Sequence, residues 1–132
     1  MVIDTSVLIA VLSNEPEAAA FEHALARDPV RMIAAPNLME TSIVIEHRFG
    51  EAGGRELDLL LFKAGIQVIH TDDEQIELAR EAYRRFGKGH HRAGLNFGDC
   101  FAYALSRTTG EPLLFKGDDF SLTDVSAVEV GH

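Results

Sequence analysis

The sequence contains a single cysteine, Cys100, among its 132 residues. One cysteine excludes an intrachain disulfide and leaves no cysteine cluster to bind zinc, which favours a reducing compartment. Cys100 also lacks the neighbouring histidine or asparagine pattern of a thiol nucleophile. We therefore expect it to be a small buried residue of the core.

Long apolar runs are absent as well. The longest uninterrupted one, Val7 to Leu12, is far too short to span a bilayer. The first residues have no basic flank ahead of an apolar run, so they do not resemble an export signal. We expect a cytoplasmic protein with no membrane partner.

Positive charge is scarce, because 12 Lys and Arg stand against 21 Asp and Glu and give a formal net charge of −9. This balance excludes a protein that coats nucleic acid by bulk electrostatics, which requires clustered lysine and arginine. Any nucleic acid must be held locally, or the acidic excess serves a basic partner. The basic residues that do cluster are Arg80, Arg84, Arg85, Lys88 and Arg92, together with His90 and His91.

No internal repeat, low-complexity tract or linker rich in proline, glycine or serine divides the sequence. A chain of 132 residues, 46% of them hydrophobic, is enough for one domain with a core and too short for two. We predict a single domain over residues 1–132.

Short apolar runs alternate with segments of helical spacing. The expected strands are residues 1–4, 32–35, 66–69, 113–115 and 127–130. The expected helices follow Asp4, run from Pro16 to about Arg27, from Pro36 to a break at Gly50 to Gly54, from Arg55 to about Ala64, from Thr71 to Phe86, and from Asn96 to about Thr108. Thr71 with Glu74 has the pattern of a capping box. The side chains expected to face the core are Leu38, Ile43, Val44 and Phe49 in the helix after Pro36, and Ile76, Ala79, Tyr83 and Phe86 in the helix after Thr71.

This alternation of apolar strands and amphipathic helices predicts a parallel sheet covered on both faces by right-handed crossovers. The expected fold class is α/β, as a three-layer α/β/α domain around a short, mainly parallel sheet of four to five strands. In such a sheet the carboxyl ends of strands and the amino ends of helices share one edge, where ligands bind.

Acidic residues from four distant segments map to that edge. They are Asp4 at the end of the first strand, Glu40 early in the helix after the second, Asp99 in the first turn after Asn96, and Asp118 and Asp119 after the strand 113–115. Glu40 and Asp99 each precede apolar residues by three and four positions, so both should face inward.

Converging carboxylates repel one another and lose hydration, which raises some of their pKa values unless a cation binds. Hard oxygen ligands suit Mg²⁺, with Mn²⁺ as a substitute. An ion held there activates a water and offsets the charge on a departing oxygen, which is metal-assisted phosphodiester hydrolysis. One ion or two would serve.

Each acid also has an ordinary structural alternative. Asp4 could cap the first helix, Asp99 could pair with the Asn96 cap, and Glu40 could favour the positive end of its helix dipole. Asp118 and Asp119 could be turn residues. The unusual fact is that acids from all four segments fall on one edge.

These residues resemble the PIN-domain family, and within it the VapC-type toxins of bacterial toxin–antitoxin pairs. The resemblance spans essentially the whole chain. It rests on four segments: Val-Ile-Asp4-Thr5-Ser6, Asn-Leu-Met-Glu40-Thr-Ser, Leu-Asn96-Phe-Gly-Asp99-Cys-Phe-Ala-Tyr-Ala, and Leu-Leu-Phe-Lys-Gly-Asp118-Asp119-Phe. It implies a PIN-like fold, an Mg²⁺-dependent endoribonuclease that inhibits translation, a homodimer, and a VapB-type antitoxin that inserts a segment near the acids.

Carried over residue by residue, Asp4 and Asp99 match the family's metal ligands and Glu40 its third acid. For the fourth acid the family often has a carboxylate where this chain has Gly117, so we choose Asp119 and keep Asp118 in reserve. Thr5, Ser6 and Asn96 resemble the polar residues that orient ligands or water.

RNA contacts are expected in the loop Lys88-Gly-His90-His91-Arg92, which is flexible, basic and shortly precedes Asn96. A solvated loop is the equal alternative. Lys116 could also approach a phosphate, although a solvent-facing lysine is commoner at a strand end. Arg80, Arg84 and Arg85 stand at helical spacing from Glu77 and Glu81, which favours surface ion pairs.

Two other functions compete with the nuclease. Receiver domains and aspartyl-phosphate phosphatases also gather acids at a parallel sheet edge, but Asp4 has no second acid two residues on. A catalytically silent PIN module that only binds proteins is the other alternative.

Overall fold

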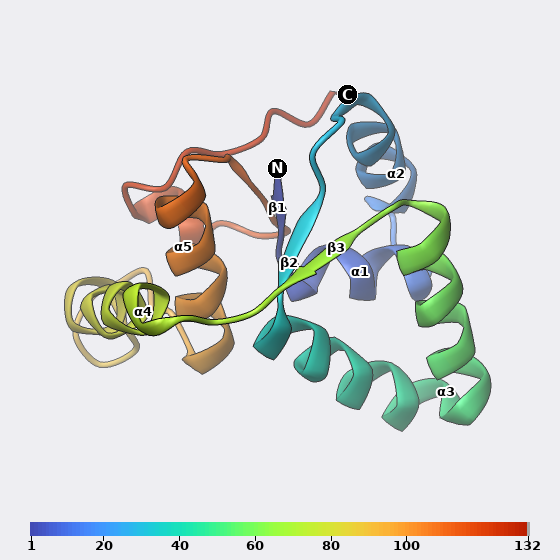
Figure 1. Cartoon of the computed structure of the whole chain (residues 1–132), viewed down its shortest axis with the longest axis horizontal. Helices are drawn as coiled ribbons and strands as arrows, with labels where there is room; N and C mark the ends of the chain where they lie inside the picture. The colour runs from blue at the N-terminus through green and yellow to red at the C-terminus, as the bar shows by residue number, and fades with distance from the viewer. Residues whose placement is uncertain (132) are drawn as a thin grey trace.

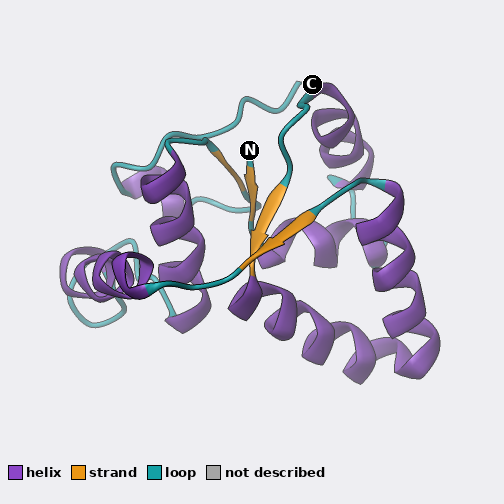
Figure 2. Ribbon diagram, viewed as in Figure 1, coloured by secondary structure: helices purple, strands orange, loops and turns teal. Residues whose placement is uncertain are grey.

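A computed structural model describes residues 1–131 and shows four parallel strands between two layers of helices (Figure 1). The strands, in the spatial order β3-β2-β1-β4, are β1 (Val2–Ile3), β2 (Met32–Ala34), β3 (Gln67–Ile69) and β4 (Leu113–Leu114). The helices are α1 (Thr5–Leu12), α2 (Ala18–Arg27), α3 (Ala35–Lys63), α4 (Asp73–Phe86), α5 (Phe97–Thr109) and the 3₁₀ helix η1 (Asp119–Leu122). Helices dominate over the short strands (Figure 2), and the predicted α/β class is confirmed.

The sheet separates two apolar cores because neighbouring residues of a strand point to opposite faces. Val2 packs with α4 and α5, whereas Ile3 packs with α1, α2 and the second half of α3. Val2 is in register with Met32 on one side and with Leu113 on the other, so the α4–α5 core crosses three strands. Burial on both faces explains why β1, β2 and β4 are continuously apolar, whereas the edge strand β3 is largely exposed.

The prediction of a strand at residues 127–130 is wrong. That segment makes only an isolated bridge between Leu113 and Ala127, with the Val128 N–H donating to the Leu113 carbonyl at 2.9 Å. The sheet therefore has four strands among the described residues, the lower end of the predicted range.

The predicted break in α3 is confirmed at Gly50, whose φ of 68° and ψ of −159° interrupt the helix. Glycine tolerates that backbone because it lacks a Cβ. The helix resumes at once, so Gly53 and Gly54 lie inside it and the second part begins before Arg55.

Several predicted helix details are wrong. In α3 the buried face is Asn37, Thr41 and Ile45, whereas Ile43 and Phe49 are exposed. In α4 the buried residues are Gln75, Ala79, Ala82 and Phe86, whereas Ile76 and Tyr83 are exposed. The α4 cap is Asp72, which accepts the Gln75 N–H at 2.9 Å, in place of the predicted Thr71 and Glu74 box. Helix α2 begins at Ala18, two residues after Pro16.

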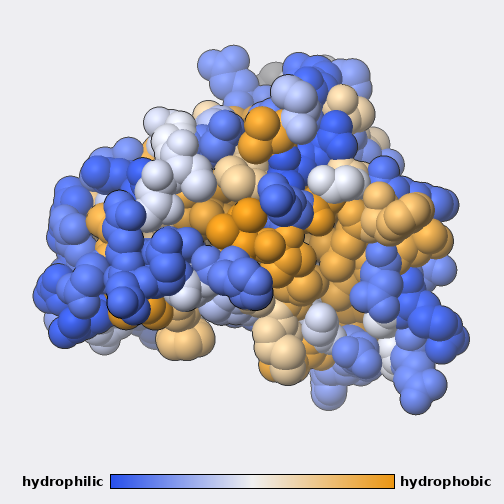
Figure 3. All heavy atoms as spheres, viewed as in Figure 1, coloured by the Kyte–Doolittle hydropathy of each residue, from blue (hydrophilic) through white to orange (hydrophobic). Residues whose placement is uncertain are grey.

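The face in Figure 3 carries apolar side chains over β3 and the second half of α3. Exposed large hydrophobic residues of these elements include Leu59, Phe62 and Val68. Within residues 1–131, no helix combines the length and the apolar character that crossing a membrane requires.

Candidate active site

Asp4 lies where β1 passes into α1, at the carboxyl edge of the sheet. Its Oδ2 accepts the Ser6 N–H at 3.1 Å and the Ser6 hydroxyl at 2.6 Å, so Asp4 is the N-cap of α1. The residue is only 4% exposed. Burial raises the pKa of Asp4, the Ser6 hydrogen bonds oppose this rise, and the charge of Glu40 adds to it. The cap and the buried acid are therefore the same group.

Asp99 lies in the first turn of α5 and closes a capping box with Asn96. The Asn96 Oδ1 accepts the Asp99 N–H at 2.9 Å, and the Asp99 Oδ2 accepts the Asn96 N–H at 3.0 Å. Burial raises the pKa of Asp99 to about 7, the bond from Asn96 opposes the rise, and the charges of Asp4, Glu40 and Asp119 add to it. A cap alone would lower this pKa, so the neighbouring acids and burial prevail.

Glu40 reaches the same place from α3. A Cβ added to Gly98 would lie 2.5 Å from each Glu40 carboxylate oxygen, so this carboxylate lies directly against the first turn of α5. Glu40, Asp4 and Asp99 line one open cavity of about 220 Å³. The other lining residues are Thr5, Ser6, Asn96, Ile9 and Val44. The structure thus brings together three of the four predicted acids and all three predicted polar neighbours.

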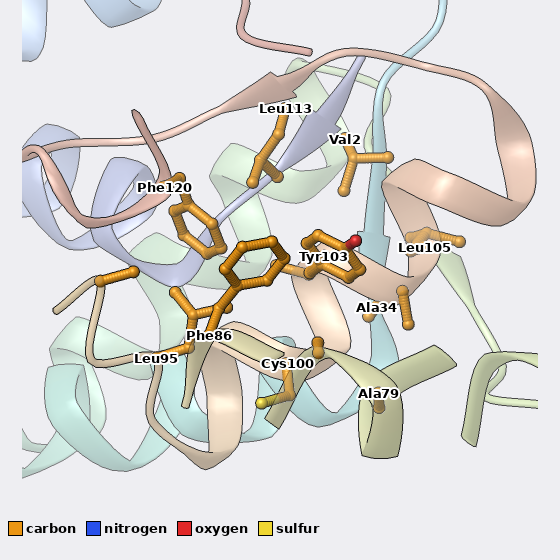
Figure 4. Packing of buried hydrophobic residues seen from close by; sticks show 14 of the residues in the cluster. Val2, Ala34, Ala79, Phe86, Leu95, Cys100, Tyr103, Leu105, Leu113 and Phe120 are labelled. Atoms are coloured by element: carbon orange, nitrogen blue, oxygen red, sulfur yellow. The ribbon is translucent and has the colours of Figure 1, made fainter. Parts of the chain in front are cut away.

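Asp119 and Asp118 lie outside the cavity lining and are exposed. Asp119 is the first residue of η1, and its charge helps to raise the pKa of Asp99. Asp118 is not among the main causes of that rise. The next residue, Phe120, is buried and points into the core beside Phe86 and Tyr103 (Figure 4). This anchor holds η1, and with it Asp119, near the edge of the sheet.

The segment after η1 is fixed to α5 by a polar cluster. The Tyr103 hydroxyl donates to Asp124 at 2.6 Å, and Arg107 donates to the same carboxylate at 2.6 Å. Burial, followed by the bond to Asp124, raises the pKa of Tyr103 to about 12. Tyr103 is therefore a neutral donor, and it holds the Asp119 segment against the helix that carries Asp99.

The donor chemistry of the cavity fits a hard divalent cation. Its acids supply only carboxylate oxygens, and the buried Asp4 faces the charge of Glu40 without a lysine or arginine in the lining. In residues 1–131, however, no three His, Cys, Asp or Glu side chains are grouped so that they could hold an ion as they stand. The acids share a cavity without meeting at one point, so water would complete the coordination.

The predicted RNA-binding residues do not line the cavity. His90 packs edge-on against Tyr83, and His91 packs against Phe86 while its Nδ1 accepts the Ala93 N–H at 2.9 Å. Lys88 and Arg92 are exposed in the same loop.

The backbone of Lys116 contacts the site, whereas its side chain points away from it. Its N–H donates to the Ser6 hydroxyl at 2.9 Å, while its ammonium pairs with Glu15 at 2.7 Å and Glu17 at 3.0 Å. The predicted surface ion pairs of α4 are confirmed as Arg80 with Glu77 and Arg85 with Glu81. Cys100 is buried as expected, and burial raises the pKa of its thiol to about 11.

Sequence reasoning missed Asn37 and Gly98, which join the acid-bearing helices. The Asn37 Nδ2 donates to the Gly98 carbonyl at 2.9 Å, and Asn37 is fully buried. A polar residue three positions before Glu40, on the same helical face, was the available signal.

A family model described as the PIN domain matches residues 1–125. The chain belongs to the PIN-domain family. Two relatives cover nearly all of it. Ribonuclease VapC of Mycolicibacterium smegmatis is 59% identical over 97% of this chain and 99% of the relative, and Ribonuclease VapC30 of Mycobacterium tuberculosis is 54% identical over 97% of this chain and 98% of the relative. These matches confirm the predicted VapC-type ribonuclease toxin, and they argue against the receiver-domain and phosphatase alternatives.

The fold of this PIN-domain chain is also shared with a solved structure. The toxin VapC20 of Mycobacterium tuberculosis superposes with a TM-score of 0.80 over 96% of this chain and 97% of that chain, at 22% sequence identity. Identity this low shows the fold alone, and it confirms the predicted PIN-like architecture.

Proposed function

We propose that this VapC ribonuclease hydrolyses RNA phosphodiester bonds at the cavity of Asp4, Glu40 and Asp99, with Asp119 as the fourth acid. The observation that carries the proposal is that acids from three distant segments line one cavity in which the pKa values of two of them are raised. A bound divalent cation would compensate the negative charge of these neighbouring carboxylates, which burial and mutual repulsion otherwise disfavour.

Mg²⁺, or Mn²⁺ in its place, would be held by these acids directly or through water. When bound, the ion supplies an activated water and offsets negative charge on the departing oxygen. The chain's own contribution is positioning. Ser6 donates to Asp4 and accepts from the Lys116 backbone, so it orients the Asp4 carboxylate relative to the β4 end of the site. Asn96 holds Asp99 through the capping box.

RNA is the proposed substrate, and a VapB-type antitoxin is the proposed partner of a homodimeric toxin. With a net charge of −9, the chain cannot hold RNA by general attraction, so contacts must be local. The proposed contacts are Lys88, His90, His91, Arg92 and Lys116, whose ammonium would have to leave Glu15 and Glu17. Thr5 lines the cavity as a supporting residue, and Asp118 is the reserve for Asp119. We also propose that residues 1–132 form a single PIN domain.

The test is RNA cleavage by purified protein with Mg²⁺ or Mn²⁺ and with EDTA. Asp4→Asn and Asp99→Asn keep an oxygen for each helix cap but remove a charge, so both should fold and lose cleavage. Asp72→Asn, which alters the exposed cap of α4 outside the cavity, is the matched control and should cleave like the parent. Cleavage unaffected by EDTA, or retained by both cavity variants, would contradict metal catalysis.

A growth assay separates a nuclease from a silent binding module. Induced parent protein should arrest bacterial growth, and Asp99→Asn should not. Equal toxicity of the two proteins would instead indicate that the effect comes from binding.

A further inference from the structure

Asn37 is fully buried where the segments that carry the three acids of the cavity meet. We infer that Asn37 is a positioning residue, which fixes the Glu40 carboxylate relative to Asp99 and so sets the geometry in which the cation is bound. This inference rests on the proposed function and names a residue that acts through its neighbours.

Three hydrogen bonds make Asn37 a junction. Its Nδ2 donates to the Gly98 carbonyl of α5 at 2.9 Å, across 61 residues of sequence. Its backbone carbonyl accepts a hydrogen bond from the Thr5 hydroxyl of α1 at 3.1 Å and another from the Thr41 hydroxyl of α3 at 2.7 Å. Thr5 follows Asp4, and Gly98 precedes Asp99. The segments bearing Asp4, Glu40 and Asp99 are therefore joined through one fully buried residue.

The contact with Gly98 also determines where Glu40 can lie. Glu40 is three residues after Asn37, on the same face of α3. Its carboxylate lies against the α-carbon of Gly98, at a place that a Cβ would fill. Asn37 and Glu40 thus contact the same residue of α5, Gly98, which immediately precedes Asp99. Asn37 donates to the Gly98 carbonyl, and the Glu40 carboxylate packs against the Gly98 α-carbon.

Stability does not account for this amide. The Asn37 Oδ1 is buried and has no hydrogen-bond partner in the described part of the chain, a situation that destabilises a folded protein. Gly98 lies inside α5, so its carbonyl has a place in the helical hydrogen-bond ladder without Asn37. An apolar side chain of similar size would avoid the unpaired oxygen. A buried amide that lowers the stability of the fold is consistent with a residue that holds the side chains of a functional site in position.

The experiment compares Asn37→Leu with a matched control, Gln75→Leu. Gln75 is also buried, donates its Nε2 to the His70 carbonyl at 2.9 Å, and leaves its Oε1 unpaired, but it does not line the cavity. We expect Asn37→Leu to lower RNA cleavage, and to weaken Mn²⁺ binding in a spectroscopic titration, by at least about ten-fold, as displaced ligand supports do. Its thermal midpoint should stay close to that of Gln75→Leu, which should bind Mn²⁺ and cleave like the parent.

Parent-like Mn²⁺ binding and cleavage by Asn37→Leu would overturn the inference, and so would equal losses in the two variants. If Asn37→Leu does not fold, Asn37→Ser, whose side chain is too short to reach the Gly98 carbonyl, takes its place with the same expected losses. A parent protein that cleaves no RNA would instead count against the proposed function, and the Mn²⁺ titration would still decide whether Asn37 positions the carboxylates.

Discussion

Replacing Asp99 by asparagine isolates the electrostatics of the cavity, because the substitution removes a charge and leaves the helix cap. Burial, with added charge from Asp4, Glu40 and Asp119, raises the pKa of Asp99 from 3.8 to about 7. The capping box needs only an oxygen to accept the Asn96 N–H, which an asparagine also provides. The metal-free Asp99→Asn protein should therefore be more stable than the parent at neutral pH.

The direction follows from proton binding. Between pH 3.8 and about 7 the folded protein keeps a proton on Asp99 that the unfolded chain has released, so the free energy of unfolding falls as the pH rises. This contribution is fully present below the unfolded pKa and is lost as the pH passes the folded one. A shift of roughly three units corresponds to at most about 4 kcal/mol. Because Asp99 is only partly buried, solvent screening reduces the expected effect to about 1–2 kcal/mol.

The assay is urea denaturation in EDTA at several pH values. The excess stability of Asp99→Asn should be small near pH 4.5 and reach its full size above pH 7. Adding Mg²⁺ should then stabilise the parent more than the variant, because the ion binds the folded carboxylates. The control Asp72→Asn should show no such pH-dependent gain. An Asp99→Asn protein that is less stable than the parent at pH 8 in EDTA would refute the reasoning.

Two further substitutions test other contacts of the site. Gly98→Ala places a methyl group 2.5 Å from the Glu40 carboxylate oxygens, so RNA cleavage should fall by about ten-fold or more while the urea midpoint changes little. An unchanged cleavage rate would show that cleavage does not require the Glu40 carboxylate to pack against α5. Tyr103→Phe removes the hydroxyl that donates to Asp124 at 2.6 Å and should lower the free energy of unfolding by about 1–2 kcal/mol, with an unchanged value counting against the polar cluster.

The order of strands and helices could be predicted from sequence because it depends on local patterns. Continuous apolar runs indicated buried parallel strands, and Gly50 marked a break that its positive φ confirms. The acidic edge followed from the same patterns, since parallel strands place their carboxyl ends together. Asp4, Glu40 and Asp99 could therefore be assigned to one edge of the sheet from the sequence.

The faces of the helices could not be predicted so well, because a helix buries whatever its neighbours cover. Hydrophobicity favoured Ile43 and Phe49 in α3, yet the tertiary structure exposes both and buries Asn37 and Thr41. The Asn37 side chain finds its one hydrogen-bond partner, the Gly98 carbonyl, in a distant segment, whereas the Thr41 hydroxyl donates to the Asn37 backbone carbonyl one turn earlier in the same helix. In α4 the cap is Asp72 and not the adjacent Thr71, since the Asp72 carboxylate accepts the Gln75 N–H.

The sequence by itself determined the α/β class and the edge at which the acids gather, because hydrophobic periodicity, helix-ending residues and residue type are local properties. Its four acidic segments carried the resemblance to the PIN-domain family. Only the tertiary structure decided that residues 127–130 form a single bridge and that Asn37 joins the acid-bearing helices. It also decided that Asp99 carries a pKa near 7. These features depend on burial and on contacts between groups far apart in the chain, and no local pattern encodes them.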